Sequence, residues 1–275
     1  MKFTKMQGLG NDYIYVNCLE ESVPDPVETA RKISDRHFGV GSDGLVLILP
    51  DEQADFRMRM FNSDGSEAEM CGNAARCVGK YIHDRGLSSR EEIRLMTGAG
   101  LKTLRLTVQG GVTAAVRVDM GEPILEAERI PTTLTGLQVI NTPVEALGET
   151  YGATCVSMGN PHAVIFVEDA DSFDVHGVGA AIENYPLFPR RTNVEFVTVE
   201  DREHLRMRVW ERGAGETLAC GTGACASLVA AVLNGISERK AILRLNGGPL
   251  TVEWDPVTNH VFQEGPAEFV FDGDY

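Results

Sequence analysis

The sequence predicts an α+β protein made of two pseudo-symmetric, strand-rich domains, each wrapped around a central helix. Three observations support this fold class. The chain repeats itself at a shift of 149 residues, short β-branched or alternating runs fill both halves, and one apolar helix follows a Cys-Gly pair in each half. A chain of 275 residues has room for two such domains, because each is then large enough to bury its own core.

The repeat is clearest between residues 56–75 and 205–224, where seven of twenty positions are identical. Residue frequencies predict roughly one or two matches by chance. Without a gap, the same shift carries Gly10-Asn11 onto Gly159-Asn160 and residues 93–101 onto 242–250. The sequence therefore predicts two similar halves that meet near Gly121.

The strands are predicted from short runs that are separated by Gly, Pro, Asn and Asp. In the first half they cover residues 13–17, 45–50, 56–62, 103–108 and 112–120. In the second half they cover residues 163–168, 194–199, 204–210, 241–245 and 250–254.

One helix in each half is predicted to lie in the core. Residues 222–233 read TGACASLVAAVL and have no polar face, and Asn234-Gly235 follows as a stop signal. Its counterpart covers residues 74–84. A further helix is predicted at residues 26–36 and a short turn at 143–147.

The charge and the composition exclude several classes of function. A formal net charge of -15 argues against nucleic-acid and anionic-membrane surfaces, and no apolar run approaches the length of a membrane span. The N-terminal segment has no apolar stretch typical of a secretory signal, so a cytoplasmic location is expected. The six cysteines are too few for a disulfide scaffold and are expected to remain thiols there.

The predicted chemistry lies at Cys71-Gly72 and Cys220-Gly221, where a thiol precedes each central helix. A helix N-terminus has unpaired N–H groups and a partial positive charge, so it can hold a carboxylate and lower a thiol pKa. If the halves face each other, both thiols point into one cleft. One thiolate then removes a proton from a carbon while the opposite thiol protonates its other face.

Other uses of the same residues are less well supported. A single Cys at a helix start is more often a small buried residue, but two at matching positions favour chemistry. The other four cysteines, Cys18, Cys77, Cys155 and Cys225, have no cysteine at the matching position of the other half, and Cys77 and Cys225 are expected in the core. Their spacing lacks a zinc knuckle, and no nucleophile elbow or phosphate-binding loop is present, so neither a metal nor a cofactor is predicted.

Positions where the halves differ suit the asymmetric part of a substrate. Asn62 corresponds to Glu211, Ser63 to Arg212, Gly44 to Asn193 and Tyr13 to His162. Glu211, Arg212, Asn62 and Asn193 form a set that fits an ammonium and a carboxylate group. For Arg212 alone a solvated surface charge is the ordinary interpretation. His162 is either structural or tunes a nearby thiol.

The sequence resembles the diaminopimelate epimerase family along essentially its whole length. The matching motifs are GLGNDY (8–13), GSDGLVLI (41–48), FNSDGSEAEMCGNAARC (61–77), SMGNPHAV (157–164), TNVEFV (192–197) and VWERGAGETLACGTGA (209–224). The resemblance implies a cofactor-independent enzyme that interconverts LL- and meso-diaminopimelate for lysine and peptidoglycan synthesis. Gly44 replaces a Gln found in some members and removes a possible substrate contact there.

The resemblance also implies roles for individual residues. Cys71 and Cys220 are the acid/base pair, and His162 and Glu211 tune the thiols. The implied substrate-binding residues are Asn11, Asn62, Gly72, Asn73, Asn160, Asn193, Glu211, Arg212, Gly221 and Thr222.

The same resemblance implies a homodimer and a last strand that returns to the first domain. The predicted domains are therefore residues 1–120 plus 265–275, and residues 121–264. The alternatives are an enzyme like proline or hydroxyproline racemase and a non-catalytic amino-acid-binding protein. We further expect oxidation without ligand to join Cys71 to Cys220, and mass mapping of inactivated protein that finds both thiols free contradicts this.

Overall fold

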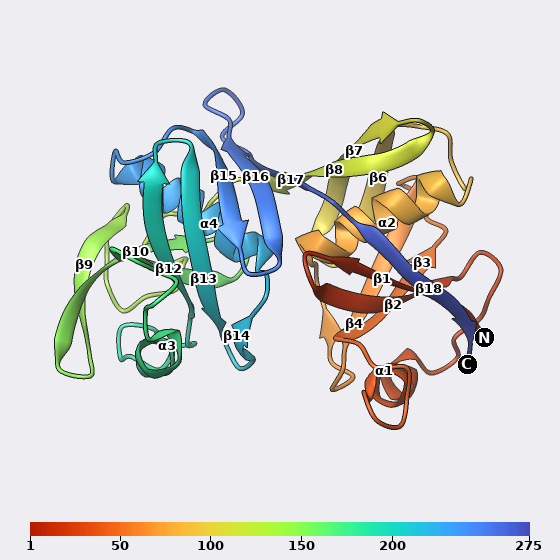
Figure 1. Cartoon of the computed structure of the whole chain (residues 1–275), viewed down its shortest axis with the longest axis horizontal. Coiled ribbons are helices and arrows are strands. Elements are labelled where there is room, and N and C mark those ends of the chain that lie inside the picture. Colours follow the sequence, from red (N-terminus) through yellow and green to blue (C-terminus); the bar gives the residue numbers. More distant parts are fainter. The chain divides into compact units, whose positions relative to one another are not determined.

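The computed structural model describes residues 1–275 and divides into two compact units (Figure 1). The first unit comprises Met1–Asp119 and Glu264–Tyr275, and the second comprises Met120–Gln263. Both are rich in strands and contain two helices each, which confirms the predicted α+β class.

The sheet of the first unit begins with the last strand of the chain. β18 (Glu268–Asp274) pairs with β1 (Lys2–Gly8), which pairs with β2 (Asn11–Asn17). The sheet continues through β3 (Gly44–Leu49), β4 (Phe56–Asn62), β6 (Glu92–Thr97), β7 (Gly100–Gln109) and β8 (Val112–Gly121), and β5 (Glu67–Ala68) pairs with β4. The pairings β2–β3 and β4–β6 are parallel, and the others are antiparallel.

Two helices complete the first unit. α1 (Pro26–Ser34) begins where Asp25 accepts a hydrogen bond from the Glu28 N–H at 3.0 Å and Pro26 takes the first helical turn. It ends two residues earlier than predicted because Asp35 has an extended backbone. α2 (Gly72–Asp84) lies against β1, β2 and β7, and its residues from Gly72 to Ile82 are all buried.

The second unit repeats this order of elements. Its sheet runs β9 (Val139–Ala146), β10 (Glu149–Ser157), β11 (Pro161–Phe166), β12 (Asn193–Asp201), β13 (His204–Glu211), β15 (Lys240–Leu245) and β16 (Gly248–Trp254), with β14 (Gly215–Thr217) on β13; β17 (Val261–Gly265) follows in the chain. α4 (Gly221–Leu233) contacts β10–β13, β15 and β16, so its apolar sequence is accounted for by burial inside the unit.

The strand registers reproduce the sequence repeat up to the central helices. Tyr13 lies opposite Gly44 on β2–β3, as His162 lies opposite Asn193 on β11–β12. Beyond the helices the ungapped alignment is wrong by one residue. Hairpin β6–β7 pairs Thr97 with Gly100, but hairpin β15–β16 pairs Leu245 with Gly248, a shift of 148. The segment between α4 and β15 is therefore one residue shorter than the corresponding segment between α2 and β6.

Two local predictions were also wrong or incomplete. The predicted turn at 143–147 is mostly strand β9, where Pro143 pairs with Gly152 and the turn comes only at Leu147-Gly148. Helix α3 (Val175–Glu183) was not predicted, because its sequence, VHGVGAAIE, is mostly small and apolar and shows no clear polar face. The repeat itself carries the signal, since α3 lies 149 residues after α1.

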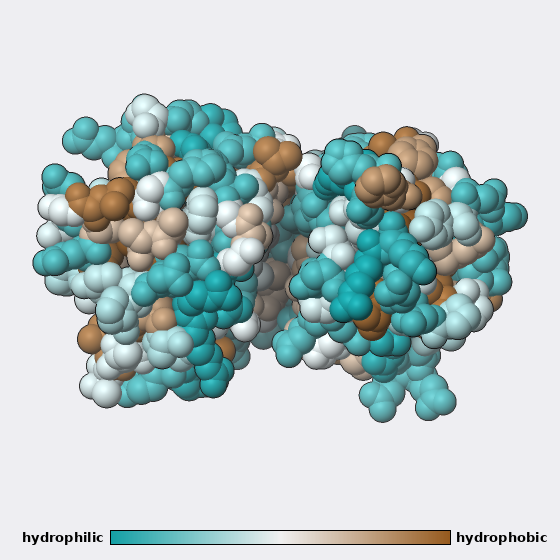
Figure 2. Space-filling model, turned by 90° about the horizontal axis from the view of Figure 1, so that it is seen from below, coloured by the Kyte–Doolittle hydropathy of each residue, from teal (hydrophilic) through white to brown (hydrophobic).

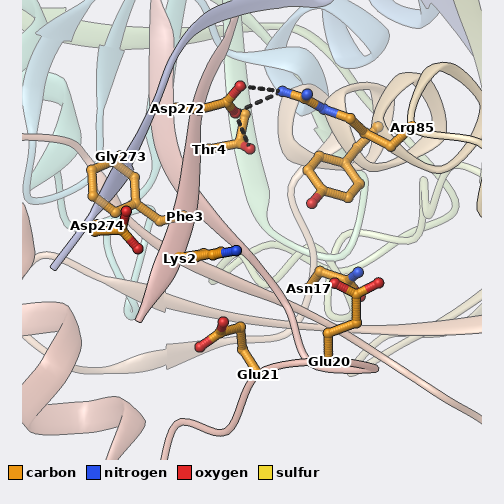
Figure 3. Close-up of a pocket in the computed structure, with 11 residues that line it drawn as sticks. Lys2, Phe3, Thr4, Asn17, Glu20, Glu21, Arg85, Asp272, Gly273 and Asp274 are labelled. Carbon is orange, nitrogen blue, oxygen red and sulfur yellow. Dashed lines mark hydrogen bonds and ion pairs between the residues drawn. The ribbon is translucent and has the colours of Figure 1, made fainter.

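The surface contains small apolar areas separated by polar ones on the face shown in Figure 2. No helix is both long enough and apolar enough to span a membrane. A cavity of about 320 Å³ in the first unit lies between β1, β18 and the end of α2 (Figure 3). Its Arg85 donates to both carboxylate oxygens of Asp272, at 2.6 and 2.8 Å, and it contains none of the predicted site residues.

Candidate active site

The first predicted thiol, Cys71, is the N-cap residue of α2. Its backbone is extended, with φ -139° and ψ 124°, and its carbonyl accepts the first helical hydrogen bond from Ala75 at 2.9 Å. The side chain is half-buried and makes no capping bond, so the sulfur is available for other contacts. Sγ lies 3.4 Å from Oδ1 of Asn11 and donates to it as a thiol.

The orientation of the Asn11 amide follows from its second partner. Its Nδ2 donates to Oδ2 of Asp43 at 2.7 Å, and a carboxylate only accepts. Oδ1 is therefore the end that faces Cys71, and it also accepts from Nδ2 of Asn73 at 3.4 Å. Asn73 in turn accepts a hydrogen bond of 2.9 Å from the fully buried guanidinium of Arg76.

The second thiol, Cys220, is the N-cap residue of α4, with φ -120° and ψ 108°. Its sulfur accepts from the Gly223 N–H at 3.4 Å and lies 3.5 Å from Oγ1 of Thr222. Burial raises the pKa of Cys220 well above its usual value, and the nearby charge of Glu211 raises it further. The contacts with Thr222 and Gly223 act in the opposite direction, because they stabilise the thiolate.

A chain of polar contacts connects His162 to this helix end. Nε2 of His162 lies 3.0 Å from Oδ1 of Asn160, and Nδ2 of Asn160 donates to Oγ1 of Thr222 at 3.3 Å. On its other side, Nδ1 of His162 lies 2.7 Å from Oε1 of Glu195, and both of these side chains are completely buried. The structure therefore brings Asn160, His162, Thr222 and Cys220 together.

Glu211 also belongs to this group. Its carboxylate accepts hydrogen bonds from Thr217 and from the Cys220 thiol, but burial raises its pKa despite them. Asn193 donates to the Pro161 carbonyl at 2.8 Å and accepts from the Arg212 backbone N–H at 2.9 Å. Asn193 thus holds the turn that follows Glu211.

The remaining predicted residues are less closely connected. Arg212 is exposed, and its guanidinium donates to the Arg190 carbonyl at 3.1 Å. Asn62 donates to Oγ of Ser66 at 3.0 Å. Gly72 is the first residue of α2. At Gly221 a Cβ would lie 2.7 Å from Oε1 of Gln263, so packing inside the unit is one reason for glycine there.

None of the six cysteines forms a disulfide bond, and the two at the helix starts differ from the rest. Cys77 and Cys225 are completely buried inside helices, which confirms the expectation that they belong to the core. Burial raises the pKa of Cys77 to about 11 and that of Cys155 to about 12, so these two thiols are inert at neutral pH.

Sequence reasoning missed three residues that support the site, namely Asp43, Arg76 and Glu195. Each lies inside a motif that was recognised, but none lies at a position where the two halves match. A signal was nevertheless present for Glu195. At the shift of 149 it corresponds to Val46, and a charged residue in place of an apolar one inside a strand is unusual.

Comparison with known proteins identifies the family of this chain. The family model "Diaminopimelate epimerase" matches residues 3–126 and 154–270. The chain belongs to the diaminopimelate epimerase family. A relative of that name from Acetivibrio thermocellus is 63% identical over 275 residues, covering 100% of this chain and 98% of the relative. Others of that name are from Moorella thermoacetica, 56% identical over 276 residues, and Methanococcus maripaludis, 55% identical over 274 residues; each alignment covers 100% of this chain and 99% of the relative.

Solved structures show the same fold at low sequence identity. A hydroxyproline epimerase from Agrobacterium vitis has a TM-score of 0.71 at 15% identity, covering 99% of this chain and 90% of that one. A PhzF-family phenazine biosynthesis protein from Bacillus anthracis has a TM-score of 0.70 at 18% identity, covering 99% and 98%. These two matches establish the fold, whereas the closer relatives identify the family of isomerases. The racemase alternative is not favoured.

Proposed function

We propose that this chain interconverts LL- and meso-2,6-diaminopimelate, with Cys71 and Cys220 acting on opposite faces of one α-carbon. The observation that carries this proposal is the equivalent position of the two thiols. Each is the N-cap residue of the central helix of its unit, and each precedes a glycine, in a chain that belongs to the diaminopimelate epimerase family.

The proposed reaction needs one thiolate and one thiol. The thiolate removes the α-proton, the C–H electron pair moves toward the substrate carboxylate, and the opposite thiol then protonates the other face. The negative charge that develops on the carboxylate is stabilised by the N–H groups at Gly72-Asn73 and Gly221-Thr222, which begin the two central helices. Each turnover exchanges the protonation states of the two sulfurs.

The supporting residues have separate proposed roles. Asn11 and Asn160 bind beside the reacting carbon, and each contacts the polar residue two positions after its thiol, Asn73 or Thr222. His162 and Glu211 tune the second thiol. The distal ammonium and carboxylate are held by Asn62, Asn193, Glu211 and Arg212.

The mechanism uses only side chains and backbone groups of this chain, and we propose that it requires no cofactor and no metal. We also propose a cytoplasmic homodimer that supplies lysine and cell-wall synthesis. Two apolar side chains on β18, Val270 and Phe271, are 51% and 46% exposed, which supports a second copy covering this strand. The two units are proposed to be the epimerase domains 1–120 plus 265–275 and 121–264. Light scattering gives the mass that tests the dimer.

The activity is tested in deuterated water. Reduced protein incubated briefly with LL-diaminopimelate is expected to form the meso isomer and, in the first turnover, to place deuterium at one α-carbon only, as read by NMR. L-proline and trans-4-hydroxy-L-proline serve as controls and are expected to exchange no α-proton. Absence of exchange with diaminopimelate, or exchange with proline instead, contradicts the proposal.

A further inference from the structure

Glu195 is a buried carboxylate that the proposed mechanism does not use. It lies on β12 with 0% of its surface exposed, and its Oε1 is 2.7 Å from Nδ1 of His162. Its other oxygen, Oε2, has no hydrogen-bond partner. A buried carboxylate costs free energy unless it is paired or shares a proton. The contact with His162 therefore offsets part of this cost.

The two halves of the chain differ here in two coupled positions. At the shift of 149, Glu195 corresponds to Val46, and Gly223 corresponds to Ala74. A Cβ on Gly223 would lie 2.6 Å from Oε1 of Glu195, so glycine leaves the room that the carboxylate occupies beside the first turn of α4. The half without the carboxylate has a methyl group at that position. The pair of Glu195 and Gly223 is therefore specific to the Cys220 side.

The hydrogen bonds that begin at Glu195 all run in one direction. Oδ1 of Asn160 only accepts, so Nε2 of His162, which lies 3.0 Å away, carries a hydrogen. Nδ2 of Asn160 donates to Oγ1 of Thr222, which leaves the Thr222 hydroxyl hydrogen for the sulfur of Cys220 at 3.5 Å. The chain therefore ends with a donor pointed at the thiol.

We propose that Glu195 is a positioning residue for Cys220, which it affects through His162, Asn160 and Thr222. By holding Nδ1 of His162, Glu195 keeps a hydrogen on Nε2 and so keeps the whole chain donating toward the sulfur. A hydrogen bond donated to a thiolate stabilises its charged form. The inference rests on the proposed function, because it assumes that Cys220 is an acid/base group.

The charges that face Cys220 decide the sign of the effect. Burial and the charges of Glu211 and Glu195 raise the pKa of Cys220, while the contacts with Thr222 and Gly223 lower it. A contact of 2.7 Å between Nδ1 of His162 and Oε1 of Glu195 needs a hydrogen between the two atoms. Because Nε2 of His162 also carries a hydrogen, the pair as a whole has no net charge, and its repulsion of the thiolate is largely cancelled. Removing Glu195 therefore acts mainly through loss of the donor chain and makes Cys220 less reactive.

The groups that face Glu195 come from four other elements. They are His162 on β11, Cys155 on β10, Glu211 on β13 and Cys220 at the start of α4. Burial raises the pKa of Cys155 to about 12, so that thiol stays protonated, and the groups left to respond to a change at Glu195 are His162, Glu211 and Cys220. The proposal is therefore tested on the tautomer of His162 and on the thiol of Cys220.

The first experiment needs no variant of Glu195. Nitrogen-15 NMR of the intact protein reports which ring nitrogen of each histidine carries a hydrogen, and the signal of His162 is assigned by its loss in H162Q. We expect Nε2 of His162 to stay protonated from pH 6 to pH 9. The exposed His204, whose Nδ1 lies 2.9 Å from Asp201, is the control for a histidine outside this buried chain. An unprotonated Nε2 on His162 overturns the proposal.

The second experiment measures the Cys220 thiolate directly. In a C71S background, the rate of alkylation of Cys220 by iodoacetamide is followed from pH 6 to pH 10 by peptide mass mapping. E195V is expected to slow the reaction about tenfold at neutral pH, which corresponds to a midpoint about one pH unit higher. E195Q is expected to stay within about twofold of the parent rate, because its amide N–H donates to Nδ1 and leaves the hydrogen on Nε2. The half-buried Cys18 is the internal control.

Two results overturn the proposal, namely an unchanged Cys220 profile in E195V or a shift in E195Q as large as that in E195V. The double variant E195V/G223A reproduces the Val46–Ala74 pair of the first half and provides a second test if E195V alone is poorly folded. It is expected to show the slow alkylation of E195V. No substrate is used in either experiment, so the result is independent of whether the proposed epimerase activity is correct.

Discussion

The two thiol-bearing helix ends share one frame but have opposite polar surroundings. In the first unit, Nδ2 of Asn11 donates a hydrogen bond to Asp43, and Oδ1 of Asn11 accepts one from Cys71. In the second unit, Oδ1 of Asn160 accepts a hydrogen bond from His162, and Nδ2 of Asn160 donates one to Thr222. The residue type and its position are repeated, but the polarity of the amide is reversed.

The charges near the two thiols differ in the same way. The buried Arg76 supports Asn73 in the first unit, whereas the carboxylates Glu195 and Glu211 lie near Cys220 in the second. An acid and a base that act on one carbon must have different protonation states. A duplicated scaffold supplies two thiols in equivalent positions, and unlike partners can then separate their protonation states. The symmetric fold thus gives the two thiols equivalent positions, and the asymmetric residues around them make the two thiols different.

The largest expected effect comes from removing either thiol. C71A and C220A are each expected to lower net epimerisation by more than about a thousandfold, because a two-base reaction cannot finish with one base. Each variant retains slow exchange from only one face, so the two should differ in which isomer exchanges its α-proton in deuterated water. The control is C18A, which is expected to keep its activity. Full activity in either C71A or C220A excludes the two-base mechanism.

The C-terminal ends of the two central helices provide the next comparison. α2 ends in a buried network in which Lys80 lies 2.9 Å from Asp84, which also accepts from Thr113, whereas α4 has Val229 and Leu233 at the corresponding positions. Burial alone raises the pKa of Asp84, but its hydrogen bonds outweigh this and lower it to about 2.

D84N is therefore expected to lower the free energy of unfolding by about 3 kcal/mol at pH 7. The folded pKa is depressed, so this stability is present above the unfolded pKa near 4 and is lost as the pH falls toward 2. Urea midpoints measured from pH 7 to pH 2.5 should therefore converge for wild type and D84N. A difference that stays constant over this range contradicts the linkage.

The glycine at the start of α4 sharpens the comparison further. G223A is expected to destabilise the protein by about 2 kcal/mol, because its Cβ overlaps Oε1 of Glu195. In E195V/G223A, which copies the first half, most of this loss should be recovered. The measurement is a double-mutant cycle of thermal unfolding with wild type, both single variants and the double variant. Additive losses indicate that the two positions are not coupled.

The smallest expected effect concerns the anchor of Asn11. D43N replaces an acceptor-only carboxylate by an amide that also donates, so the Asn11 amide is no longer held in one orientation. We expect kcat/KM for diaminopimelate to fall about tenfold, mainly through KM. R36Q is the matched control, because Arg36 contacts the other oxygen of Asp43 and its loss leaves the bond to Asn11 in place. A larger effect in R36Q than in D43N contradicts this role of Asp43.

Much of the fold could be predicted because the sequence contains it twice. The run from 222 to 233 is apolar on every side, and only burial inside a sheet accommodates such a helix. Strands such as 45–50 and 194–199 were found because they are β-branched and bounded by turn residues. Strands β9 and β10 were missed because Asn141, Pro143 and Gly152 interrupt their apolar runs.

The sequence by itself determined the duplication, the α+β class and the two thiols at matched helix starts. It did so because helix boundaries and strand periodicity are local properties of the chain. Only the tertiary structure decided that Asp43 orients Asn11 and that Glu195 contacts His162, since these residues lie 32 and 33 positions apart from their partners in the sequence. Hydrogen-bond direction depends on which donor meets which acceptor, and that is known only when the strands have been brought side by side.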